Sequence, residues 1–148
     1  MATVVRLSEL PSYKTAVVAG IDHNFDVARA AYRECINICR AARDAGSLAL
    51  LLQMLGDMEA EAGNLNEFER CHAEAIALDP RSRLPRFFYA RSLFRYLKHV
   101  KAAEAELGRV ESMLATSNFP CDDGELPLSY YEREIGQLRA EIANAPEP

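Results

Sequence analysis

The sequence predicts an all-α fold built from antiparallel helical hairpins, and three observations lead to this prediction. Apolar residues make up 49% of the 148 residues and charged residues 26%, which suits one globular domain with a sizeable core. Apolar positions recur at intervals of three and four along most of the chain, the period of an amphipathic helix. Most turn-forming residues stand between these periodic segments. We therefore expect a single helical domain over residues 1–148.

Residues 8–45 predict the first hairpin. The helical pattern begins at Ser8, and Pro11 falls in the first turn, where the missing N–H of proline is harmless. The buried stripe of this helix would contain Tyr13, Ala16, Val17 and Ile21. Residues 26–45 then repeat apolar positions at helical spacing, and Gly46 is expected to end this longer helix.

Residues 47–80 predict the second hairpin. Ser47 is expected to cap its first helix, and Gly63 marks the turn. Asn64 and Glu67 then have the spacing of a capping box, in which each side chain satisfies a free backbone N–H of the next helix. The Asp79-Pro80 pair is expected to end this helix, because proline disfavours α geometry in the residue before it.

Residues 82–115 predict a third hairpin, with a turn near Lys98 that lacks the usual glycine. Residues 116–127 mix Asn, Pro, Asp and Gly as a loop does. A last amphipathic helix is expected over residues 129–144, with Ser129 and Glu132 as its capping box. Stacked hairpins leave an apolar end uncovered, so we interpret this helix as a C-terminal cap.

Residues 49–82 carry the clearest pattern in the chain, a unit of 34 residues. The positions that define it are Leu52, Leu55, Gly56, Gly63, Leu65, Ala75, Leu78 and Pro80. Their spacing resembles that of a tetratricopeptide repeat (TPR). Shifting the template by 34 residues places Ala90 at the position of Gly56, whereas Phe68 and His72 depart from the usual residue types. The resemblance implies a short TPR-like α-solenoid of stacked hairpins.

The resemblance also implies a function, because the first helices of such repeats line a concave groove that holds a peptide or a helix of another protein. The positions mapped to this partner-binding groove are Tyr13, Gln53, Asp57, Phe87, Arg91, Phe94 and Arg95. One subclass of the family grips a C-terminal carboxylate with Lys and Asn side chains. Gln53 and Asp57 stand here instead, so we do not expect that chaperone-binding activity.

The stretch from Arg81 to Lys101 contains seven cationic residues and no carboxylate. Arg91 and Arg95 share a helical face, with Phe87 and Phe94 nearby in sequence. Guanidinium forks beside aromatic rings suit an acidic peptide with apolar anchors. The alternative is that the rings pack on neighbouring helices while the arginines are solvated or paired with acids. These two interpretations make different demands on the exposure of the rings.

The acidic residues are gathered elsewhere and suggest an alternative function. Residues 57–79 hold seven carboxylates against one arginine, and residues 122–147 hold seven against two. Basic and acidic helix surfaces of two subunits would attract each other, so a structural homo-oligomer, such as a homodimer, is the alternative to a foreign ligand. The formal net charge of −5 argues against a nucleic-acid partner, since phosphates are repelled by a net acidic surface.

Catalytic and metal-binding patterns are weak. Cys35 and Cys39 lie one helical turn apart, with Cys71 and His72 as further candidate ligands, but the paired short motifs of a zinc site are missing. We interpret these cysteines as free thiols in the core. No histidine has an evident nucleophile beside it, and no glycine-rich phosphate loop is found. We therefore expect no catalytic residues, no metal and no cofactor.

The N-terminal stretch lacks the segments of a signal peptide, and no apolar run approaches the ~18 residues that span a bilayer. We expect a soluble, cytoplasmic protein without a membrane partner. The sequence thus favours a non-catalytic protein–protein interaction module that acts as an adaptor, small chaperone or assembly factor.

Overall fold

The computed structural model describes residues 2–116 and 126–146. These residues form seven α-helices and one short 3-10 helix, and they contain no strand, which confirms the all-α prediction. Contacts divide the chain into two compact units, Met1–Asp79 and Pro80–Pro148, and each is described by itself. Residues 117–125 of the predicted loop, with Cys121, lie outside the described residues.

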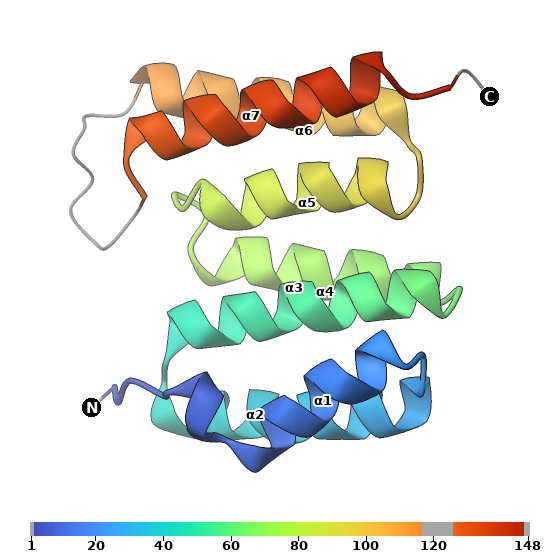
Figure 1. The fold of residues 1–148 in the computed structure, drawn as a ribbon. Helices are drawn as coiled ribbons and strands as arrows, with labels where there is room; N and C mark the ends of the chain where they lie inside the picture. Colours follow the sequence, from blue (N-terminus) through green and yellow to red (C-terminus); the bar gives the residue numbers. More distant parts are fainter. Residues whose placement is uncertain (1, 117–125, 147–148) are drawn as a thin grey trace. The chain divides into compact units, whose positions relative to one another are not determined.

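The Met1–Asp79 unit contains two helical hairpins (Figure 1). Its elements are the 3-10 helix Leu7–Glu9, α1 (Pro11–Ile21), α2 (Phe25–Ala42), α3 (Ala45–Glu61) and α4 (Leu65–Leu78). Helix α1 packs on α2, α3 packs on α4, and α2 packs on α3, so a continuous core runs through both hairpins. Buried Cys35 and Cys39 of α2 and Leu51 and Leu52 of α3 lie in that core.

Helices α3 and α4 approach each other closely at Gly56. A Cβ atom at this position would lie 2.9 Å from Cδ2 of His72 and 3.1 Å from Cβ of Cys71, which is too close for any side chain to enter without displacing α4. Glycine is thus required by the helix contact and not by its backbone angles. The close approach also brings the imidazole of His72 into the interior, where the side chain is 1% exposed.

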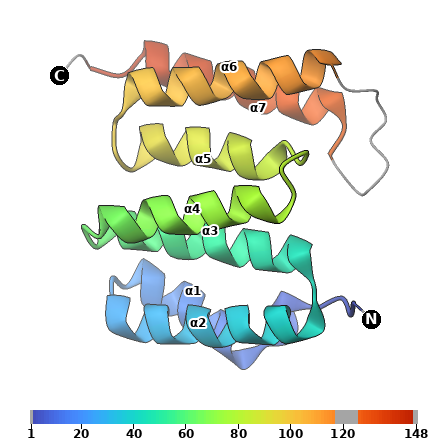
Figure 2. The ribbon, with the colours of Figure 1, turned by 180° about the vertical axis from the view of Figure 1, so that it is seen from behind.

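The Pro80–Pro148 unit contains α5 (Leu84–Arg95), α6 (Val100–Thr116) and α7 (Leu128–Ala143). Lys98 takes the left-handed conformation (φ 57°) that the turn between α5 and α6 requires, so this turn forms without a glycine. Helix α7 lies alongside α6 (Figure 2) and buries Tyr131, Ile135 and Leu138. A helix therefore follows the last hairpin, close to the predicted position.

Two predicted helix boundaries around residue 44 are wrong. Helix α2 ends at Ala42, and Arg43 closes it in a left-handed conformation, so Gly46 lies inside α3. The cap of α3 is Asp44 and not Ser47, since the carboxylate of Asp44 accepts hydrogen bonds from the Ser47 N–H (3.1 Å) and hydroxyl (2.7 Å). The pKa of the Asp44 carboxyl is lowered, because these bonds and one from the Val5 N–H outweigh the cost of its burial.

The two predicted capping boxes do not form. The Asn64 side chain makes no bond to the first turn of α4, because its amide donates to Oε1 of Glu59 (3.0 Å) instead. Helix α7 begins at Leu128 after Pro127, two residues earlier than a cap at Ser129 allows. In both places a helix forms close to the predicted location without a side-chain hydrogen bond at its cap residue.

Candidate protein-binding site

Gln53 and Asp57 belong to a buried hydrogen-bond network between α3 and α4. The Gln53 amide donates to Oδ2 of Asp57 (2.7 Å), and Nε2 of His72 lies 3.0 Å from Oδ1 of the same carboxylate. The ring of Phe68 packs against that imidazole, with centroids 4.7 Å apart. Gln53 and Asp57 are each only 7% exposed. These two predicted groove residues therefore present little surface to a ligand and hold two helices together.

The predicted groove aromatics on α5 are buried as well. Phe87 is 1% exposed and Phe94 is 5% exposed. The guanidinium carbon of Arg91 lies 5.9 Å from the ring centroid of Phe87 and 4.7 Å from that of half-buried Phe88. Lys98 similarly places Nζ 5.0 Å from the Phe94 centroid. Arg91 and Lys98 thus lie over the faces of these rings, in the geometry of cation–π contacts.

The two predicted groove arginines have different partners. Arg95 forms a bidentate ion pair with Glu141 of α7, at 3.0 Å from Nε and 2.7 Å from Nη2. This hydrogen bonding lowers the pKa of the Glu141 carboxyl. Arg91 makes no ion pair with any carboxylate in the described part of the chain. Of the two, Arg91 is therefore the arginine whose donors stay available to a ligand.

The structure joins some of the predicted groove residues directly. Gln53 bonds to Asp57, and Arg91 stacks over Phe87. Tyr13, half-buried on α1, lies with Gln53 and Asp57 in the Met1–Asp79 unit, and the remaining predicted residues lie in the Pro80–Pro148 unit. One groove formed by all of them stays a prediction.

The acidic run in residues 57–79 is largely neutralised within its own unit. Three of its carboxylates form ion pairs with arginines of that unit: Glu59 with Arg29, Glu67 with Arg70 and Glu74 with Arg40. Asp57 and Glu61 lie beside the imidazole rings of His72 and His23. The pair of Glu59 and Arg29 is bidentate (2.6 and 2.9 Å), and it lowers the pKa of the Glu59 carboxyl. Little unpaired acid is left on α3 and α4 to attract a second subunit.

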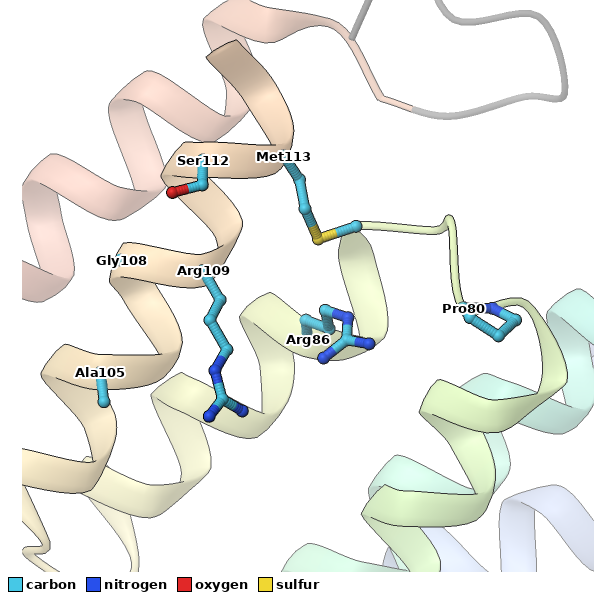
Figure 3. Close-up of a pocket in the computed structure, with 7 residues that line it drawn as sticks. All are labelled: Pro80, Arg86, Ala105, Gly108, Arg109, Ser112 and Met113. Carbon is cyan, nitrogen blue, oxygen red and sulfur yellow. The ribbon is translucent and has the colours of Figure 1, made fainter. Parts of the chain in front are cut away.

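A recess between α5 and α6 is the feature that sequence reasoning missed. It has a volume of about 690 Å³ and lies entirely within the Pro80–Pro148 unit (Figure 3). The residues that line it are Pro80, Arg86, Ala105, Gly108, Arg109, Ser112 and Met113. The sequence does hold a signal, because the small residues at 105, 108 and 112 follow helical spacing on the face of α6 opposite its core stripe.

Within residues 2–116 and 126–146, no group of three or more His, Cys, Asp and Glu side chains is placed to hold a metal ion. Cys35, Cys39 and Cys71 are free and buried, and burial raises the pKa of the Cys71 thiol to about 11, which keeps it protonated and unreactive. In the same residues no helix combines the length and the hydropathy needed to cross a bilayer. No family model, curated protein or solved structure matches the chain.

Proposed function

We propose that this chain is a non-catalytic, cytoplasmic protein-interaction module of the TPR-like kind, which binds a peptide or a helix of a partner protein in a concave groove. It would act as an adaptor, small chaperone or assembly factor. The observation that carries the proposal is Arg91, a cation on α5 that stacks on aromatic rings and forms no ion pair within 4.0 Å in the described residues.

Charge supports an acidic partner. The stretch from Arg81 to Lys101 supplies no carboxylate of its own, and Arg95 forms an ion pair with Glu141 of α7. Stacking leaves the in-plane N–H groups of a guanidinium free to donate, so Arg91 can hold a carboxylate while Phe88 offers apolar surface beside it. An acidic residue flanked by an apolar anchor fits this arrangement.

Packing supports the repeat register. Gly56 and Ala90 stand 34 residues apart, each in the first helix of a hairpin, and Ala90 is fully buried while Gly56 sits at the closest helix contact. Small residues at equivalent positions let the two helices of a hairpin approach in the same way. In this proposal Phe87 and Phe88 support the guanidinium group of Arg91, and Arg91 makes the ligand contacts.

Affinity capture from native cell extract, with identification of bound proteins by mass spectrometry, tests the proposal. Arg91→Glu should abolish capture of a specific protein. Lys14→Glu is the matched control, because Lys14 is an exposed cation on α1 and the charge change is the same. The double change Arg95→Glu with Glu141→Arg keeps an ion pair between α5 and α7 while reversing the sign on α5. Capture that is unchanged by Arg91→Glu, or recovery of the bait alone, would contradict the proposal.

Light scattering separates this function from the homo-oligomer alternative. The proposal requires a monomer of 16.5 kDa that binds its partner at moderate salt. A mass of a dimer that falls as salt is raised would favour the alternative instead, because screening weakens partly exposed charge contacts. The internal neutralisation of the acids on α3 and α4 argues for the monomer.

A further inference from the structure

The recess between α5 and α6 lies on a different side of α5 from Arg91. Arg86 lines the recess, and Arg91 follows five positions later, which turns it about 140° around the helix at ~100° per residue. Arg91 stacks over Phe88, whereas Arg86 and Arg109 extend from α5 and α6 into the recess (Figure 3). The recess is therefore a separate feature from the groove residues discussed above.

Gly108 leaves open space on the face of α6 that lines the recess. A Cβ atom placed on Gly108 would meet no other heavy atom within 4 Å. Ala105 and Ser112 lie one turn before and one turn after Gly108 and have short side chains. No long side chain therefore projects from this part of α6. Longer side chains, those of Arg86, Arg109 and Met113, rise around this floor (Figure 3).

The charge at the recess is positive and incompletely neutralised. Arg86 makes no ion pair with a carboxylate in the described part of the chain. Arg109 uses Nη1 to donate to Oε1 of Glu106 (2.7 Å), and its side chain is still 65% exposed. Of the two guanidinium groups at the recess, Arg109 donates one hydrogen bond to a carboxylate and Arg86 donates none among the described residues. Spare donors remain for an anionic group from outside the chain.

We propose that this recess binds an acidic side chain of a partner peptide, with the carboxylate between Arg86 and Arg109 and a neighbouring apolar side chain against Met113 and Pro80. The inference rests on the proposed protein-binding function and adds a site to it. Guanidinium groups match the two oxygen atoms of a carboxylate, and the flexible thioether of methionine adapts to apolar side chains of different shape.

The mixed lining favours a peptide over a free anion or a polyanion. Met113, Pro80 and Ala105 add apolar contact that inorganic phosphate would not use. A nucleic acid would bring many phosphates toward a chain with a formal charge of −5, which repels them beyond the recess. One carboxylate beside one apolar side chain uses both kinds of lining.

Selection of short random peptides on the immobilised full chain tests the inference, followed by affinity measurements on the enriched peptides. Enriched sequences should pair Asp or Glu with an adjacent apolar residue. Replacing that acid by its amide should weaken binding about tenfold, as expected for the loss of a charge-assisted contact. Arg86→Gln should weaken binding to a similar extent.

Gly108→Leu should also abolish binding, because the new side chain fills the recess from its floor. Gly108→Ala is the matched control, since it adds one methyl group in open space and should leave binding intact. A thermal melt of both variants shows that the chain remains folded. Lys101→Gln controls for the loss of one positive charge in Arg86→Gln, because Lys101 is exposed and lies outside the recess.

Three outcomes would overturn the inference. Peptides whose binding is lost with Arg91→Glu but not with Gly108→Leu would contradict the recess while supporting the proposed function. Enrichment of no peptide at all would contradict both. A preference for phosphoserine over Glu at the acidic position, with competition by inorganic phosphate, would replace the carboxylate by a phosphate as the group that the arginines hold.

Discussion

The α3–α4 and α5–α6 hairpins are both helical pairs with a small residue at the helix contact, but they treat their polar groups differently. In α3–α4, the buried carboxylate of Asp57 serves both Gln53 and His72. In α5–α6, the hydroxyl of Ser92 is fully buried without a hydrogen-bond partner among the described residues, and Oε2 of Glu106 is likewise unpartnered. Both oxygen atoms of the buried Asp57 carboxylate are thus hydrogen-bonded in the first hairpin, whereas the second hairpin holds two buried oxygen atoms without a partner among the described residues.

Surface charge follows the same division. Acids of α3 and α4 are matched by cations of the same unit, such as Arg29 and Arg40. On α5, Arg86 and Arg91 form no close ion pair in the described residues, although the charge of Arg91 contributes to lowering the pKa of Glu141. Balanced charges contribute to a fixed structure, whereas unbalanced ones are available to a ligand. This difference in charge pairing supports our proposal that α3–α4 stabilises the structure and α5 binds a partner.

The largest effect is expected at Glu59, because this carboxylate is buried and holds Arg29 through two hydrogen bonds. Glu59→Ala removes one member of a buried pair and should cost about 3–5 kcal/mol of unfolding free energy, measured by urea denaturation. Glu67→Ala is the control, since its exposed pair with Arg70 is worth less than about 1 kcal/mol. Equal costs in the two variants would contradict the structural role of α3–α4.

Acid should weaken this same contact. Hydrogen bonds from Arg29 lower the pKa of Glu59, so folding holds the ionised form more tightly than the unfolded chain does. The resulting stability is fully present above the unfolded pKa of about 4.3 and is lost as pH falls through the lowered folded value. Urea titrations across this range should show a shallower acid loss for Glu59→Gln than for the unchanged chain. If the free energy of unfolding fell equally steeply with pH in both chains, the ionisation of Glu59 would not contribute to stability.

Two glycines provide a smaller, matched comparison. Gly56→Ala places a methyl group 2.9 Å from His72 and should destabilise the chain by roughly 1–3 kcal/mol through overpacking. Gly108→Ala places it in open space and should stabilise the chain by roughly 0.5–1 kcal/mol through helix propensity. Thermal unfolding of both variants measures the difference. Changes of the same sign would mean that the packing contrast is wrong.

The smallest effect is expected at Ser92. Ser92→Ala removes a buried hydroxyl that has no described partner and adds helix propensity, so the chain should gain roughly 0.5–1 kcal/mol. Asp57→Ala, the counterpart in α3–α4, should instead lose stability because two buried groups lose their acceptor. Urea midpoints decide the sign. A loss at Ser92 would show that its hydroxyl is satisfied.

Helix positions were predictable because apolar periodicity reports which face of a helix is buried. The same periodicity misassigned Gln53 and Asp57 to a ligand surface, because a polar residue on an inward face is recognised only once its partner His72 is in place. The predicted cap at Asn64 also did not form, and its side-chain NH2 group instead donates to Glu59 across the turn. Local rules fix local hydrogen bonds only where no tertiary partner offers a better one.

The recess was not predictable in the same way. Arg86 and Arg109 are far apart in sequence and lie on different helices. They come to line the same recess only because α5 packs on α6. Small residues at 105, 108 and 112 are equally consistent with a close helix contact, as Gly56 shows in α3. Among the described residues, Gly56 is covered by a neighbouring helix and Gly108 is not, and only the tertiary packing determines this difference.

Hydrogen exchange on the complex with a captured partner tests most directly the proposal that α5 binds the partner and α3–α4 does not. Amide exchange of the full chain is compared with and without the partner, by mass spectrometry at peptide resolution. Partner binding should protect peptides that cover Leu84–Arg95 while leaving exchange in Ala45–Glu61 unchanged. Protection confined to Ala45–Glu61 and Leu65–Leu78 would contradict the assignment of binding to α5.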